Sequence, residues 1–183
     1  MSQGILLYGP PASGKDTITT TLCELNDTYG AFKRLKIGSG RTRGYRMGTA
    51  DQLAELEARG DVIYRNDRYG NIYLVDRPGL DDAMRDGHIP ILHLGQLTGL
   101  EAVAGKFPAT WTSVLLWCSR ESTETRSKGR GDSDTEARLA AWDATAQDLK
   151  AGSDFAWDLR LDTDAMSPAE AAQEIDFLIR RST

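Results

Sequence analysis

The sequence predicts an α/β fold of three layers, in which a mostly parallel central sheet carries helices on both faces. Short apolar runs alternate along the chain with amphipathic helical segments, an order typical of parallel sheets buried on both sides. The first apolar run, 4–8, leads through a glycine loop into a helix expected over Lys15 to about Leu25. At 183 residues the chain fits one domain, residues 1–183.

The later elements follow from capping residues, turn residues and hydrophobic spacing. Thr49 or Asp51 can cap a helix that ends at Gly60, and Pro78 begins another that stops near Gly87. Ser167 and Pro168 mark the start of a closing helix. The remaining predicted elements are a strand, turn and strand over 61–75, apolar runs at 89–95 and 113–119, a long helix over 134–150 and a last strand over 155–163.

Composition limits the class of partner. The formal net charge of −5 lacks the basic surplus of a nucleic-acid or anionic-membrane binder. Cys23 and Cys118 match no metal or redox spacing and are expected to be reduced core thiols. The N-terminal apolar run is too short for a signal peptide or a membrane span. We therefore expect a cytoplasmic monomer or homodimer that acts on a small molecule.

The segment YGPPASGKDT contains a phosphate-binding pattern with one departure. Gly9, Gly14 and Lys15 match G-x-x-x-x-G-K, but Asp16 stands where Ser or Thr is usual, and Thr17 follows. Such a loop offers backbone N–H groups and a helix N-terminus to phosphate. The alternative is a tight turn with a chance lysine, which the preceding strand and following helix disfavour. The predicted ATP-binding residues are Gly9, Pro10, Ala12, Ser13, Gly14, Lys15, Asp16 and Thr17.

The metal ligand at this loop has two candidates. The Ser or Thr hydroxyl of the usual loop completes the oxygen shell of Mg²⁺, and a carboxylate at Asp16 is also a hard oxygen ligand. Thr17 is the other candidate, although it also suits a capping or packing role. Asp16 could instead only favour the helix N-terminus electrostatically. ATP and Mg²⁺ are the predicted cofactors either way.

A basic cluster lies between Asp27 and Asp51, a stretch with no acidic residue between those two. Arg43 and Arg46 follow a predicted strand end, where ligands of α/β sheets bind, and the arginine fork suits a phosphate. For these two we expect a bound phosphate. Arg41 belongs to the same cluster, and three further basic residues, Lys33, Arg34 and Lys36, are expected to form a solvated face.

These motifs resemble guanylate kinase, a P-loop NTPase-fold kinase. Its S-x-T-T-R-x-x-R pattern is similar to the segment from Ser39 to Arg46, and its G-N-x-Y segment to Gly70–Tyr73. The resemblance implies that Arg43, Arg46 and Tyr73 hold the acceptor's phosphate and that Ser39 faces its base. The acceptor-binding segment is expected over about 38–76. Tyr64, Asn71 and His93 could line the same pocket.

A lid is implied by the same resemblance, over about 120–140. The family's R-x-x-x-R-G pattern, followed later by R-L, is matched in order by Arg126, Arg130 and Arg138. Phosphoryl transfer needs such charges to neutralise the moving group and a lid to exclude water. These three arginines and Lys15 are the predicted catalytic residues. A surface helix with scattered arginines is the alternative.

The chain departs from the family where the acceptor base is read. The family's guanine-reading carboxylates align with Tyr64 and Gly95, and the acceptor subdomain is trimmed after Arg46. Guanine donors without a carboxylate would lose about 1 to 3 kcal/mol each. The first expectation is an ATP-dependent kinase acting on a nucleoside monophosphate. The alternatives are a phosphosugar kinase resembling ribose 1,5-bisphosphate phosphokinase, a specialised-metabolite kinase, or a nucleotide-binding scaffold without turnover.

Overall fold

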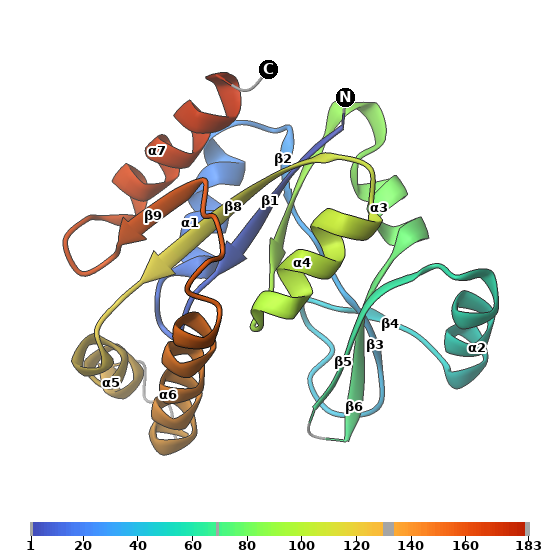
Figure 1. Ribbon diagram of the computed structural model, residues 1–183, viewed down its shortest axis with the longest axis horizontal. Coiled ribbons are helices and arrows are strands. Elements are labelled where there is room, and N and C mark those ends of the chain that lie inside the picture. Colours follow the sequence, from blue (N-terminus) through green and yellow to red (C-terminus); the bar gives the residue numbers. More distant parts are fainter. Residues whose placement is uncertain (1, 69, 130–133, 182–183) are drawn as a thin grey trace.

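The computed structural model describes residues 2–68, 70–129 and 134–181. Its central sheet has five strands in the order β2 (Tyr29–Ala31), β7 (Ile89–His93), β1 (Gln3–Tyr8), β8 (Thr110–Trp117) and β9 (Leu159–Asp162). Every neighbouring pair is parallel. The predicted α/β P-loop fold with a mostly parallel sheet is confirmed (Figure 1).

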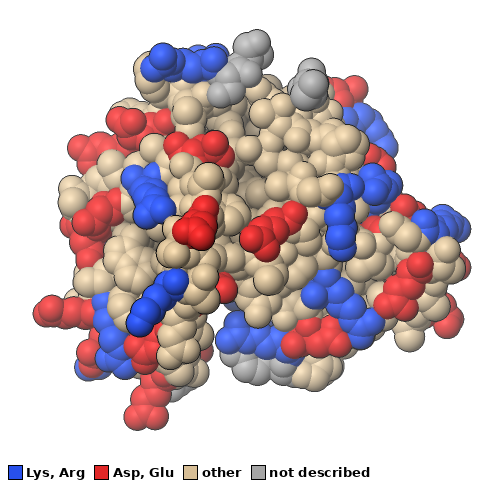
Figure 2. Space-filling model, viewed as in Figure 1, with Lys and Arg blue, Asp and Glu red and all other residues tan. Residues whose placement is uncertain are grey.

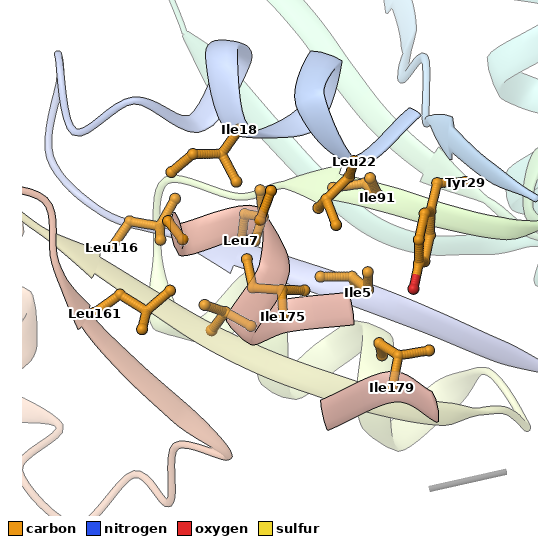
Figure 3. Close-up of a cluster of buried hydrophobic side chains, with 13 residues drawn as sticks. Ile5, Leu7, Ile18, Leu22, Tyr29, Ile91, Leu116, Leu161, Ile175 and Ile179 are labelled. Carbon is orange, nitrogen blue, oxygen red and sulfur yellow. The ribbon is translucent and has the colours of Figure 1, made fainter. Parts of the chain in front are cut away.

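One face of this sheet is covered by α1 (Lys15–Leu25) and α7 (Pro168–Arg181). Ile5 and Leu7 of β1 point toward these helices and pack with Ile18, Leu22 and Ile175 (Figure 3). Helix α7 begins with a capping box, because the Ser167 hydroxyl accepts from the Glu170 N–H and the Glu170 carboxylate accepts from the Ser167 N–H. The predicted cap at Ser167 is confirmed.

The other face of the sheet is covered by α3 (Arg77–Ala83) and α4 (Leu97–Lys106), with a 3-10 turn at Arg85–Gly87 between α3 and β7. Leu6 and Tyr8, the alternate residues of β1, are buried on this side with Leu80, Leu100 and Val103. Helices on both faces give the three predicted layers. Helix α4 itself was not among the predicted elements.

A second sheet stands beside the first, in the order β4 (Arg46–Met47), β3 (Leu35–Ile37), β6 (Asn71–Asp76) and β5 (Val62–Arg68). The hairpin of β5 and β6 is antiparallel, as the strand, turn and strand prediction requires. Helix α2 (Ala50–Arg59) packs on this sheet through Leu53 and Leu56, with Thr49 as its N-cap and Gly60 ending it in a left-handed conformation. Both predicted ends of α2 are confirmed.

Two further helices, α5 (Arg120–Gly129) and α6 (Thr135–Ala151), project below the central sheet on the side opposite β5 and β6 (Figure 1). They pack against each other. The long helix predicted over 134–150 agrees with α6 within one residue at each end. Among the described residues, no helix has the length and apolar character needed to cross a membrane.

Candidate active site

The loop after β1 has the backbone of a phosphate cradle. Gly9 and Gly14 have φ of 158° and 88°, and Gly14 stands immediately before α1 as its N-cap. A Cβ at Gly9 would collide with the carbonyl oxygen of Leu116 in β8, so the position requires glycine. Ala12 also has a positive φ, 62°, which a non-glycine residue rarely adopts. The loop therefore presents its backbone at the N-terminus of α1, where anions bind.

Lys15 lies inside this loop. Its Nζ donates to the carbonyl oxygens of Gly9 and Pro10, both at 2.7 Å, and to the Ser13 hydroxyl at 3.2 Å. Burial lowers the pKa of Lys15 to about 8, while the neighbouring Asp16 carboxylate acts in the opposite direction. Bound phosphates would replace these oxygen acceptors with charged ones.

Asp16 and Thr17 follow Lys15 in the first turn of α1, and both are exposed. The Asp16 carboxylate lies 3.4 Å from His93 Nδ1, and the hydrogen bond with His93 holds the pKa of Asp16 below its usual value. The other ring nitrogen of His93 is 2.7 Å from the Thr19 hydroxyl. His93 thus joins the end of β7 to α1. The oxygens of Asp16 and Thr17 are hard donors and fit Mg²⁺.

Two pockets flank the loop. One, of about 210 Å³, is lined by Lys15, Asp16, Thr17 and Arg138, among others. The other, of about 230 Å³, is lined by Gly14, Thr17, Arg126, Thr163 and Pro168, among others. These pockets bring the predicted phosphate loop beside Arg138 of α6 and Arg126 of α5. Arg130, the third predicted lid arginine, lies outside the described residues.

Arg126 is fixed by several hydrogen bonds. Its guanidinium donates to the carbonyl oxygens of Ala12, at 3.0 Å, and Thr163, at 2.7 Å, and pairs with Asp164 at 3.2 Å. Helix α5 also meets the loop through the Thr123 hydroxyl, which donates to the carbonyl oxygen of Pro11. Arg126 therefore ties the phosphate loop to the segment after β9 in this structure. Arg138 pairs with Asp134 one turn earlier on α6.

A larger cleft of about 820 Å³ opens on the other side of Lys15. The end of β7 contributes His93 to its wall, and α6 lines a second side. In Figure 2 the lower edge of the molecule is notched between the part built on α5 and α6 and the part built on the second sheet, with Lys and Arg side chains on both sides. The polar side chains that line the cleft are Lys15, Arg34, Asn66, Asp67, Arg68, His93, Gln96, Thr145, Gln147 and Asp148.

The predicted acceptor residues are placed unevenly around this cleft. Ser39 and Arg43 are exposed on the loop between β3 and β4. The rings of Tyr73 and Tyr45 are in contact, with centroids 5.3 Å apart. Tyr64 reaches the cleft edge, where its hydroxyl donates to Gln96 Oε1 at 2.5 Å. Asn71 begins β6 and lies against Gly38.

Arg46 is not brought to the cleft. Its guanidinium forms an ion pair with Asp76, whose side chain is 3% exposed, and its Nε donates to the carbonyl oxygen of Lys33. Asp76 also caps α3 by accepting from the N–H of Gly79. The predicted contact of Arg46 with a phosphate would require this pair to break.

One expectation for the basic cluster was wrong. Lys36 is 2% exposed instead of solvated, and its Nζ donates to the carbonyl oxygens of Ser39 and Arg41 at 2.6 and 2.8 Å. A buried ammonium needs such acceptors. Lys36 thereby fixes the start of the loop that carries Arg43.

Several cleft residues were missed by the sequence reasoning: Arg34, Asn66, Gln96 and Gln147. Arg34 was assigned to a solvated face, and the three amides belong to no motif. The one available signal was position, because Asn66 and Gln96 lie two residues after Tyr64 and one after Gly95, the positions where the base-reading carboxylates were expected.

The chain is similar to curated guanylate kinases over most of its length. It is 26% identical to the guanylate kinase of Trichormus variabilis over 176 residues, which cover 93% of this chain and 87% of the relative. It is 28% identical to that of Photobacterium profundum over 149 residues, covering 74% and 69%. No family model matches the chain.

A solved guanylate kinase from Anaplasma phagocytophilum has the same fold. The two structures superpose with a TM-score of 0.66, and the match covers 99% of this chain and 86% of the other at 18% sequence identity.

Proposed function

We propose that this guanylate kinase-like P-loop kinase, a phosphotransferase of the nucleoside monophosphate kinase type, moves the γ-phosphoryl group of Mg-ATP onto the phosphate of a nucleoside monophosphate. The observation that carries the proposal is the cleft of about 820 Å³ that opens onto Lys15. An acceptor bound in that cleft would lie next to Lys15, the residue of the phosphate loop that would hold the γ-phosphoryl group of ATP. The whole chain would act as a single kinase domain.

The donor side supports ATP. The backbone from Gly9 to Thr17 would hold the phosphates, and the pocket of about 230 Å³ beside Arg126 and Thr163 would take the adenosine end. Mg²⁺ would be bound by Asp16 or Thr17 and would neutralise charge between the β and γ phosphates. Arg138 faces the same phosphate pocket from α6, and the segment over about 120–140 would act as the lid.

The acceptor side would use the segment over about 38–76. Arg43 and Tyr73 would bind the acceptor's phosphate, with Ser39, Tyr64, Asn71 and His93 nearer its base or sugar. An acceptor phosphate is already ionised near neutral pH, so one of its oxygens attacks the γ-phosphorus without a general base as the bond to ADP breaks. The residues need only position the two phosphates and offset their charge.

The base-reading side of the cleft disfavours guanine. Of the carboxylates that line the cleft, Asp67 is paired with Arg65, and Asp148 accepts from the Tyr8 hydroxyl and the N–H of Leu97. The remaining groups there include the amides of Asn66, Gln96 and Gln147. An amide pairs with a donor next to an acceptor, as adenine, cytosine, uracil and thymine present and as O6 and N1–H of guanine also do. The two adjacent guanine donors, N1–H and the exocyclic amine, pair together only with a carboxylate, so guanine would leave one of these donors without its partner. We therefore place the acceptor among the other bases.

The test is ADP release from Mg-ATP across ribo- and deoxynucleoside monophosphates, with ribose 1,5-bisphosphate and an acceptor-free blank. We expect at least one of AMP, CMP, UMP or dTMP to exceed GMP in kcat/KM, and Lys15→Ala to abolish the activity. GMP above all others would contradict the base assignment. Turnover of ribose 1,5-bisphosphate alone would replace the nucleotide acceptor with a phosphosugar, and ATP binding with no turnover on any acceptor would favour a scaffold.

A further inference from the structure

Two arginines flank the second sheet, and the structure gives them opposite environments. Arg46, which the resemblance assigns to the acceptor's phosphate, is held by the Asp76 carboxylate and the carbonyl oxygen of Lys33. Arg34, which no motif includes, lines the cleft that contains Lys15 and His93. Within the described residues, Arg34 has no carboxylate partner, and it is half-buried.

The pairing of the strands explains this difference. Cα of Lys36 in β3 pairs with that of Tyr73 in β6, and Arg34, two residues before Lys36, therefore lies on the same face of the sheet as both. Leu35 pairs with Leu74 and with Arg46, which puts Arg46 on the opposite face. The side-chain alternation of a strand thus directs Arg34, and not Arg46, toward the face that carries Tyr73.

The contacts of Arg34 prepare its guanidinium for a phosphate. Its Cζ lies 5.3 Å from the centroid of the Tyr73 ring and 6.0 Å from that of Tyr45. Stacking on aromatic faces holds the flat guanidinium while leaving its edge N–H groups available for bidentate bonds. The ammonium of Lys36, 5.8 Å from the Tyr73 ring centroid, adds positive charge on the same face.

Arg46 cannot be recruited at low cost. Its withdrawal would leave Asp76, which is buried, without the opposite charge, and an unpaired buried carboxylate is strongly destabilising. Binding of a phosphate by Arg46 would have to offset the free energy lost with this ion pair, whereas Arg34 breaks no ion pair when it binds. A phosphate should therefore bind more favourably to Arg34 than to Arg46.

We infer that Arg34, stacked on Tyr73 and Tyr45, supplies the guanidinium that binds the acceptor's phosphate in the place that the resemblance assigns to Arg46. This inference rests on the proposed function, because it takes the cleft as the acceptor site. Arg46 is then a structural residue that joins β4 to the start of α3.

The experiment compares R34Q, R34K and R46Q with R59Q, which removes an exposed arginine of α2 as a charge control. Two quantities are measured in each: the KM of the acceptor that the wild type turns over, and the dissociation constant of Mg-ATP. We expect R34Q to raise the acceptor KM at least tenfold with less than a twofold change for Mg-ATP. R34K should recover part of the loss, and R59Q should match the wild type.

R46Q is expected to lower the midpoint of urea unfolding while the acceptor KM stays within threefold of the wild-type value. If R46Q does not fold, the acceptor KM values of R34Q and R34K test the inference on their own. An acceptor KM unchanged in R34Q would overturn the inference, as would a tenfold rise confined to R46Q.

Failure of the proposed function has a different signature. The wild type would then turn over no nucleoside monophosphate, and calorimetric binding of nucleoside monophosphates in the presence of Mg-ADP would replace KM as the measurement. Loss of that binding in R34Q alone would support the role of Arg34 in the cleft, and equal binding by wild type and R34Q, or no binding by either, would overturn it.

Discussion

At the scale of single residues, Lys15 predicts how the affinity for Mg-ATP depends on pH. Burial lowers its pKa to about 8, and its ammonium is held by the carbonyl oxygens of Gly9 and Pro10. Phosphates favour the charged form, so ATP binding raises the pKa of Lys15. Affinity is then fully present below pH 8 and is lost as the pH rises through 8, by up to about tenfold per pH unit. We expect the dissociation constant of Mg-ATP to be flat from pH 7 to 7.5 and to rise toward pH 9.5.

Calorimetric or fluorescence titration over this range checks the prediction. Lys15→Met is the control, because this variant should bind ATP more weakly and its residue 15 has no proton to lose in this pH range. A wild-type profile that stays flat to pH 9.5 would show that Lys15 keeps its proton throughout and that burial does not control it.

The choice between Asp16 and Thr17 as the metal ligand is also a question about single residues. The contact with His93 keeps the pKa of Asp16 low, so its carboxylate carries a full charge at neutral pH. We expect Asp16→Asn to raise the Mg²⁺ concentration for half-maximal activity about tenfold, and Thr17→Val to change it about twofold. Mg²⁺-dependent binding of ATP, measured without turnover, gives an independent readout. The reverse order would assign the metal to Thr17.

At the scale of elements, one side chain of α6 fixes this helix to the sheet. Asp148 Oδ2 accepts from the Tyr8 hydroxyl of β1 at 2.8 Å and from the N–H of Leu97 at 2.9 Å. Leu97 begins α4, whose own N-cap residue, Gln96, makes no side-chain capping bond. Asp148 thus supplies that cap from another helix. The C-terminal half of α6 is therefore anchored to β1 and to the start of α4.

Removal of this anchor should cost stability. We expect Asp148→Ala to lower the free energy of unfolding by about 1 to 3 kcal/mol, because α4 loses its cap and the Tyr8 hydroxyl loses its acceptor. Asp143→Ala is the control on the same helix; its pair with Arg120 is about half exposed and should contribute less than about 1 kcal/mol. Urea unfolding measures both. Equal losses in the two variants would contradict the anchoring role.

The elements also show where the sequence was informative. The loop from Gly9 to Lys15 was predictable because its backbone demands glycine at set positions. Helix α4 was not, because it has no side-chain cap of its own and its capping group comes from residue 148, which only the fold brings near. The same holds for Lys36, whose carbonyl partners are set by the path of the following loop.

The residues that line the cleft could also not be predicted without the fold, because strands distant in the sequence decide which side chains face it. Arg34 precedes β3 and Arg46 begins β4, and the registers that send them to opposite faces of the second sheet involve β4 and β6. A motif spacing describes one stretch of chain, whereas this choice depends on three strands. A local pattern could therefore predict the glycine loop and leave open which arginine lines the cleft.

At the scale of the whole molecule, the loop proposed to bind the donor and the cleft proposed to bind the acceptor share walls, so their ligands should bind cooperatively. Lys15 lines both the cleft and the phosphate pocket, and α5 bonds to the loop through Thr123 and Arg126. A nucleotide that orders the loop therefore also orders α5, which packs on α6, a wall of the cleft. With Mg²⁺ offsetting the donor's charge, this ordering should outweigh repulsion between the two anions. We expect a non-hydrolysable ATP analogue with Mg²⁺ to tighten acceptor binding at least fivefold, within the usual range of such couplings.

The coupling must be reciprocal, so the acceptor should tighten binding of the analogue by the same factor. Calorimetric titration in both orders measures it, and omission of Mg²⁺ should weaken or reverse it because the two phosphate chains then repel each other. Thr123→Val is the matched variant: it removes the hydroxyl bond to Pro11 while keeping the side-chain shape, and should reduce the coupling without changing the affinity of the acceptor alone. Equal acceptor affinity with and without the analogue would mean that the two sites are structurally independent and that α5 and α6 do not respond to the donor.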